Sequence, residues 1–239
     1  MLIRLFDFLN AYPYQAALQA AGIPYRLYPS PRAVWEAWKE DPGDAALLPL
    51  AGAASVKVGL SRWGIASLGP VRSVLLLSDT PTEKWNAVEI DDRSLSSVAM
   101  INHLMRKGLF PRLPFLPQQS HKLPSTARLL IGDEALQAAY AYPYRIDIGE
   151  IAYHKLRRGT VFAIWWALPK YAKELGKLWR RFLPARSVWI EEAGQRYGFS
   201  PDLVREYWRC LRYRLPRLGT IYWKKVFQEE SESLLQYRD

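Results

Sequence analysis

The sequence has few cysteines, few histidines and no long hydrophobic run, and each shortage excludes a class of protein. The single cysteine, Cys210, excludes an intramolecular disulfide, and a thiolate metal cluster needs more cysteines than the chain has. The three histidines, His103, His121 and His154, stand far apart without the spacing of metal ligands, so we expect no metal site. No stretch of about 18 apolar residues and no secretory signal pattern occurs, which predicts a cytoplasmic protein without a membrane span.

Motifs that identify common enzyme classes are also missing. The chain has no glycine-rich phosphate loop, no dinucleotide-binding fingerprint, no G-x-S-x-G elbow and no paired-histidine metal motif. Any active site must therefore be sought among polar residues placed by the fold.

Positive charge is in excess, and much of it falls in the last third of the chain. The chain holds 33 Lys and Arg against 23 Asp and Glu, a formal net charge of +10. One hypothesis is a nucleic-acid module, because Trp and Tyr alternate with Arg in this region. However, Tyr207, Trp208 and Leu211 keep the spacing of a helix core, and basic residues spread along amphipathic helices usually form a solvated face. We expect no nucleic-acid partner and no membrane, but a small anionic substrate.

Strands alternate with helices in the first part of the chain, which predicts an α/β protein. Strands are expected at 2–6, 25–28 and 45–48, with helices at 15–21 and from Pro31 onward, where Ser30 and Pro31 form a typical helix start. Such alternation predicts mostly parallel sheets covered on both faces.

Two further apolar strands are predicted to carry the chain between two lobes. The first runs over 71–77 and ends in a polar break, and the second runs over 161–168 and ends at Pro169. A second α/β unit lies between them, and the chain from Lys170 onward is predicted to be helical. We therefore expect a discontinuous first lobe of residues 1–78 and 169–239, and a second lobe of residues 79–168.

Polar residues follow several predicted strands, where open α/β sheets bind ligands. Asn10 follows the first strand and has an amide that both donates and accepts, although asparagine is equally suited to a turn. Ser94, Ser96 and Ser97 lie where a helix begins. Helix N-termini suit carboxylates and phosphates, and capping alone needs only one serine.

Two more polar groups are candidates for the same cleft. The segment from Gly69 to Ser73 leads into the first crossover strand, where Arg72 could pair with a carboxylate or point to water. Asp133 and Glu134 lie at a strand-to-helix turn. One of these acids could face the cleft, but capping of the helix explains them equally well.

At these positions the sequence resembles the chorismate dehydratase family of the futalosine route of menaquinone biosynthesis. The matching segments keep their order and approximate spacing over nearly the whole chain: Leu9–Pro13, Ile65–Ser78, Ser94–Val98, Leu130–Leu136, Asp147–Glu150 and Val161–Trp165. The resemblance implies the two-lobed fold of type II periplasmic binding proteins with two crossover strands. It also implies dehydration of chorismate to 3-(1-carboxyvinyloxy)benzoate by a lyase without a metal or redox cofactor.

The resemblance also implies roles for the polar residues. The helix start at Ser96 and Ser97 would anchor a substrate carboxylate, and Arg72 and Gly69 would lie near the substrate. Asn10 would orient a carboxylate or the departing hydroxyl, and Ser73 and Ser94 would donate hydrogen bonds to the leaving oxygen. The proton acceptor would be Glu134, Asp133 or a carboxylate of the substrate itself.

Two departures from the family pattern support an alternative. The turn at 49–55 has only one serine where the family is serine-rich, and the stretch before the second crossover is reduced to 158–160. The alternative is a non-catalytic or divergent protein that closes on another small carboxylate.

Overall fold

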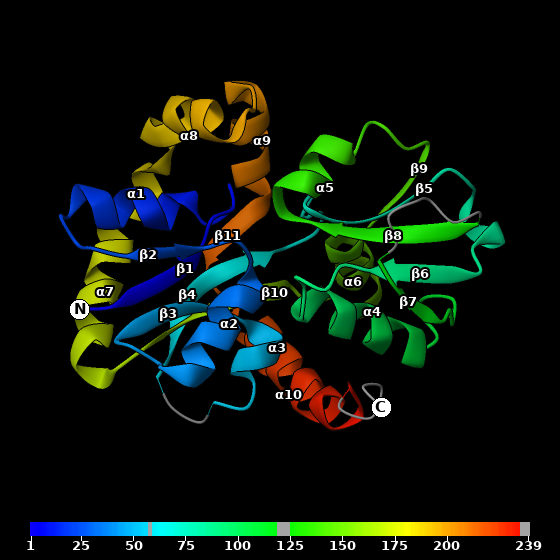
Figure 1. Cartoon of the computed structure of the whole chain (residues 1–239), viewed down its shortest axis with the longest axis horizontal. Helices are drawn as coiled ribbons and strands as arrows, with labels where there is room; N and C mark the ends of the chain where they lie inside the picture. Colours follow the sequence, from blue (N-terminus) through cyan, green and yellow to red (C-terminus); the bar gives the residue numbers. More distant parts are fainter. Residues whose placement is uncertain (57–58, 119–124, 235–239) are drawn as a thin grey trace.

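Two β-sheets, one in each lobe, organise the chain (Figure 1). A computed structural model describes residues 1–56, 59–118 and 125–234. The first sheet has the order β11-β4-β10-β3-β1-β2, and its strands are Leu211–Arg214, Leu60–Ser67, Thr160–Ala167, Ala45–Pro49, Ile3–Phe6 and Arg26–Tyr28. The second sheet has the order β7-β6-β8-β5-β9, and its strands are Phe115–Pro117, Ala87–Ile90, Thr126–Ile131, Val74–Ser78 and Tyr144–Asp147.

Helices cover both sheets. In the first lobe these are α1 Tyr12–Ala20, α2 Pro31–Glu40, α3 Leu50–Ala53, α7 Pro169–Phe182, η2 Leu183–Trp189, α8 Ile190–Tyr197, α9 Pro201–Cys210 and α10 Arg217–Leu234. In the second lobe they are η1 Thr82–Lys84, α4 Ser96–Arg106, α5 Gly132–Ala138 and α6 Ile148–Leu156. The two-lobed α/β fold expected from the sequence is thereby confirmed.

The sheets are mixed, but most strands of each run in the same direction: four of six in the first sheet and four of five in the second. β1 pairs in parallel with β2 and β3, but β10 pairs antiparallel with β3 and β4. In the second sheet β5 likewise runs antiparallel to both β8 and β9. The antiparallel strands β5 and β10 are those that directly follow the crossovers. The strands of the alternating β-α units run in the opposite direction.

The crossovers lie outside the predicted strands. Hydrogen bonding places β5 in the second sheet and β10 in the first, whereas the expected boundaries assign them the other way. The apolar run at 71–77 is interrupted because Gly69 and Arg72 have φ of 123° and 63°, so the chain turns before β5 begins. We propose lobe boundaries between β4 and β5 and between α6 and β10.

The chain after Lys170 is not wholly helical, because β11 forms an edge of the first sheet. The helix before it, α9, agrees with its sequence pattern: the Ser200 hydroxyl accepts the Leu203 N–H at 3.3 Å, and Val204, Tyr207 and Trp208 are buried. This helix carries side chains to the boundary between the lobes.

Candidate functional site

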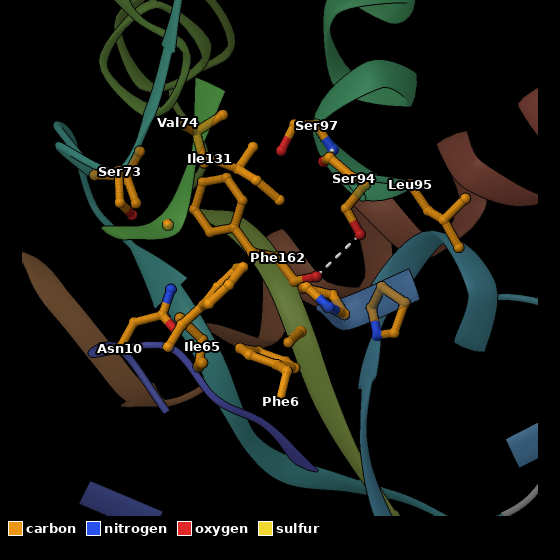
Figure 2. A pocket seen from close by; sticks show the side chains of 17 residues that line it. Phe6, Asn10, Ile65, Ser73, Val74, Ser94, Leu95, Ser97, Ile131 and Phe162 are labelled. Carbon is orange, nitrogen blue, oxygen red and sulfur yellow. Dashed lines mark hydrogen bonds between the residues drawn. The ribbon is translucent and has the colours of Figure 1, made fainter. Parts of the chain in front are cut away.

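A cleft lies between the lobes and is lined by residues of both. Its walls are apolar and include three phenylalanines, Phe6, Phe8 and Phe162. The remaining lining residues are Asn10, Pro31, Pro49, Ile65, Val71, Ser73, Val74, Ser94, Leu95, Ser96, Ser97, Ile131, Gly132 and Ala163. Figure 2 shows that the labelled polar side chains reach this cleft from opposite sides. An apolar cavity with a few convergent polar groups is the usual form of a small-molecule site.

Asn10 presents its side-chain amide to the cleft from the turn after β1 (Figure 2). Its Oδ1 is buried and has no hydrogen-bond partner among the described residues. The backbone of the turn, by contrast, is held at two carbonyl groups: Trp208 Nε1 donates to Leu9 O at 3.1 Å and the Tyr213 hydroxyl donates to Asn10 O at 3.0 Å. A fixed turn with an unpaired buried oxygen is a site prepared for a ligand that donates a hydrogen bond.

Ser73 lies on another wall of the cleft, directly before β5. It is buried, and its Oγ accepts a hydrogen bond from the Tyr207 hydroxyl at 2.7 Å. Tyr207 comes from α9 of the first lobe, so this bond joins the lobes at the edge of the cleft.

Three serines mark the start of α4, and they have different roles. The Ser94 hydroxyl accepts the Ser97 N–H at 3.2 Å and caps the helix. The Ser96 hydroxyl donates to Phe162 O at 2.9 Å, drawn as a dashed line in Figure 2, and accepts the Ala51 N–H at 3.2 Å. Ser96 therefore connects α4 to the first lobe, while the Ser97 side chain lies on the wall of the cleft.

Four residues predicted to contact a substrate do not line this cleft. Arg72 pairs instead with Glu206 at 2.8 Å, because its left-handed backbone turns it towards α9. Gly69 uses its carbonyl oxygen to accept a hydrogen bond from the Ser67 hydroxyl at 3.0 Å. Both residues belong to the turn between β4 and β5.

The other two residues are the acids of α5. Glu134 pairs with Arg93 at 2.5 Å and is 45% exposed. Asp133 points towards the turn at Leu9, and both of its oxygens accept the Leu9 N–H. Burial is the main cause that raises the pKa of Asp133 to about 7, and the Leu9 N–H opposes the shift.

The electrostatics of the cleft are set by dipoles. Among its described lining residues no side chain is ionisable. Backbone N–H groups at the start of α4 and the serine hydroxyls are the groups that can hold an anion there, helped by the positive end of the helix dipole. The same helix start was favoured from the sequence for this reason.

Sequence patterns missed the apolar and tyrosine components of the site. The helical spacing predicts that Tyr207 belongs to the core stripe of its helix. This is correct for the ring, but the spacing does not predict the hydrogen-bond partner of the hydroxyl. Phe6 and Phe8 follow one another at strand spacing, but such a pair is ordinary in a buried strand. Neither signal distinguishes a cleft wall from a core.

The described part of the chain has neither a metal-ligand cluster nor a membrane-crossing helix. No group of three or more His, Cys, Asp or Glu side chains there could hold a metal ion. No helix within that part is both long enough and apolar enough to span a bilayer.

A family model described as menaquinone biosynthesis matches residues 5–220. The chain belongs to this menaquinone biosynthesis family. The match covers the turn at Asn10, the crossovers, the start of α4 and the buried tyrosines of the C-terminal third. No curated protein matches the chain.

Solved structures similar to this family member share its fold at low sequence identity. The periplasmic aliphatic sulphonate binding protein SsuA from Escherichia coli is 14% identical, with a TM-score of 0.60 over 98% of this chain and 92% of that one. A protein from Archaeoglobus fulgidus is 11% identical, with a TM-score of 0.62 over 97% of both chains. The alkanesulfonate-binding protein from Xanthomonas axonopodis pv. citri, bound to MOPS, is 13% identical, with a TM-score of 0.57 over 89% and 86%. The periplasmic-binding-protein-like fold expected from the sequence is confirmed.

Proposed function

We propose that this protein is a chorismate dehydratase, a hydro-lyase that forms 3-(1-carboxyvinyloxy)benzoate for menaquinone biosynthesis. The observation that carries the proposal is the unpaired, buried amide oxygen of Asn10, a residue that lines an apolar cleft in a member of this family. The reaction needs a site that binds two carboxylates, encloses a ring and assists the loss of a hydroxyl. The cleft offers an anchor for one carboxylate, aromatic side chains for the ring and polar side chains for the departing hydroxyl.

The start of α4 is the proposed anchor for one substrate carboxylate. The Ser97 side chain lies there on the cleft wall, next to the first backbone N–H groups of an 11-residue helix. The first N–H groups of a helix have no partner within it and point along the positive end of its dipole, and of these the Ser97 N–H is already accepted by the Ser94 hydroxyl. The phenylalanines of the cleft then pack against the ring.

Dehydration of chorismate removes a ring proton and the neighbouring hydroxyl. The electrons of the broken C–H bond form a ring double bond, the C–O bond breaks with its electrons on oxygen, and a proton completes the departing water. Since the ring becomes aromatic, the protein mainly has to position the substrate and polarise the leaving group. Asn10 and Ser73 are the side chains that we propose for this work.

The geometry favours the substrate itself as the proton acceptor. Glu134 is paired with Arg93, and Asp133 accepts the Leu9 N–H, so neither carboxylate lines the cleft. A carboxylate of chorismate that is held near the ring proton needs no further base from the protein. We therefore prefer this acceptor to either acid of α5.

The test is direct assay of the purified protein with chorismate. We expect a product that is one water lighter by mass spectrometry and that has aromatic proton resonances. If chorismate is recovered unchanged while it still protects the protein against heat, the dehydratase proposal is wrong.

A second candidate is a protein that binds another small carboxylate without chemistry. Pro49 lines the cleft at the turn where the family has serines, which makes this wall less polar. Binding without turnover would raise the unfolding free energy by about 2.7 kcal/mol at a ligand concentration of 100 Kd. Thermal shifts with a panel of small carboxylates, combined with the absence of product, would favour this candidate.

A further inference from the structure

Tyr207 is a core residue whose hydroxyl group reaches the edge of the cleft. Its ring is fully buried on α9 together with Val204 and Trp208. The hydroxyl donates to Ser73 Oγ at 2.7 Å, across the boundary between the lobes. A buried hydroxyl is normally hydrogen-bonded, and the partner of this hydroxyl is a residue of the cleft wall, Ser73.

The direction of this hydrogen bond constrains Ser73. A phenol has a single hydrogen, and Tyr207 gives it to Ser73 Oγ. The hydrogen of Ser73 itself must then point elsewhere, and Ser73 lies on the cleft wall. A ligand oxygen in the cleft would meet Ser73 as a donor.

The surroundings of Tyr207 keep its proton in place. Burial raises the pKa of Tyr207 well above its ordinary value, and the negative charge of nearby Asp133 adds to the rise. Hydrogen bonding with Ser73 and Asn10 opposes it. Tyr207 therefore stays protonated at physiological pH and remains a donor.

We propose that Tyr207 is a positioning residue that fixes the Ser73 hydroxyl as a hydrogen-bond donor to the departing oxygen of the substrate. This inference rests on the proposed dehydratase function and adds a residue to it. Tyr207 does not line this cleft, so it acts through the side chains that its hydroxyl contacts, chiefly Ser73 and in second place the Asn10 amide. A preorganised donor stabilises charge that develops on a leaving oxygen more than one that must first rotate.

The experiment compares Tyr207→Phe, Ser73→Ala and the double variant in steady-state assays with chorismate. We expect Tyr207→Phe to lower kcat about 10- to 100-fold with little change in KM. This loss is smaller than that for removal of a donor that contacts the transition state directly, because Tyr207 acts through another residue. In the Ser73→Ala background, Tyr207→Phe should lower kcat much less than it does in the wild type, because the main residue through which it acts is gone.

Tyr14→Phe is the matched control. Tyr14 is also a fully buried tyrosine, and its hydroxyl donates to the Gly64 carbonyl at 2.8 Å instead of to a cleft residue. We expect this variant to lose stability with kcat unchanged. A purely structural role for the Tyr207 hydroxyl would make the two variants alike.

The outcomes separate this inference from the proposed function. If the wild-type protein makes no product, both fail together. If the wild type is active and Tyr207→Phe keeps its kcat, or if the two substitutions act additively, only the inference is overturned. Should Tyr207→Phe fail to fold, a fluorinated tyrosine inserted at position 207 keeps the ring and hydroxyl. An unchanged kcat with that more acidic phenol overturns the inference, and a changed kcat at constant KM supports it.

Discussion

The carboxylate of Asp133 accepts the backbone N–H of Leu9 through both of its oxygens, at 3.0 and 3.2 Å. Asp133 lies in the first turn of α5 in the second lobe, and Leu9 lies in the turn after β1 in the first. The bond therefore joins the lobes directly beside Asn10. Burial, opposed by this N–H and aided by the charge of Asp7, raises the pKa of Asp133 to about 7.

This pKa predicts how stability depends on pH. The ordinary pKa of an unfolded aspartate is about 4, so the folded protein binds this proton more tightly than the unfolded chain does. The stabilisation from this group is complete below the unfolded value and is lost as the pH rises through about 7. The free energy of unfolding, measured with denaturant from pH 4 to 8, should fall with rising pH in the wild type. The fall should be smaller in Asp133→Asn. Asp202→Asn, which changes an exposed side chain, is the control and should parallel the wild type.

Replacement of Asn10 by Ala should affect activity and spare stability. Its Oδ1 has no partner among the described residues, so within the protein only the hydrogen bond between its amide and the Tyr207 hydroxyl is lost, whereas the ligand loses its hydrogen bond to Oδ1. Loss of about 1–3 kcal/mol of interaction corresponds to a fall of roughly 5- to 150-fold in kcat/KM. The control is Asn86→Ala, whose amide oxygen accepts the Thr126 hydroxyl at 3.4 Å in the second sheet. Equal kcat/KM in Asn10→Ala and wild type would contradict the proposed site.

Ser97→Ala tests the carboxylate anchor at α4. Alanine favours the helix, so the fold should be kept, while one hydroxyl is removed from the cleft wall. We expect KM for chorismate to rise by about 10-fold, equivalent to one hydrogen bond to a charged group, with a smaller effect on kcat. Ser55→Ala removes a hydroxyl that donates to Gly52 O away from the cleft wall and should leave KM unchanged. An unaltered KM in Ser97→Ala would place the anchor elsewhere.

Ser96→Ala should instead destabilise the protein. The substitution removes the hydrogen bonds to Phe162 O and from Ala51 N, which tie α4 to the first lobe. Loss of about 1–3 kcal/mol lowers the Tm of a domain of this size by roughly 2–10 °C. Ser61→Ala, which removes only local bonds to Trp63, is the matched control for calorimetry. A Tm equal to that of the wild type would show that Ser96 does not join the lobes.

Much of the architecture could be predicted because strands and helices alternate with clear caps. The strand predicted at 161–168 is β10 with a shift of one residue, and the helix capped by Ser200 is α9. β11 was missed because Leu211 continues the apolar stripe of α9, and four residues at a sheet edge give a weak pattern. The first crossover was misplaced because the sequence pattern does not predict the left-handed backbone of Arg72, which ends the apolar run before β5.

The candidate site was only partly predictable. Asn10, Ser73 and the serines before α4 reach one cleft because strand ends and helix starts share an edge of the fold. Asp133 and Glu134 of α5 do not line this cleft. The orientation of a helix about its own axis decides which of its side chains face a cleft, and the sequence pattern does not fix that orientation. Tyr207 shows the same limit: its helical spacing predicts burial, while the target of its hydroxyl depends on contacts 134 positions apart in the chain.

The Leu9–Asn10 turn also depends on side chains from a distant part of the chain. Trp208 and Tyr213, which hold its two carbonyl groups, lie 199 and 203 positions later. Substitution of these aromatic residues therefore releases the backbone that carries Asn10, even though neither residue lines the cleft.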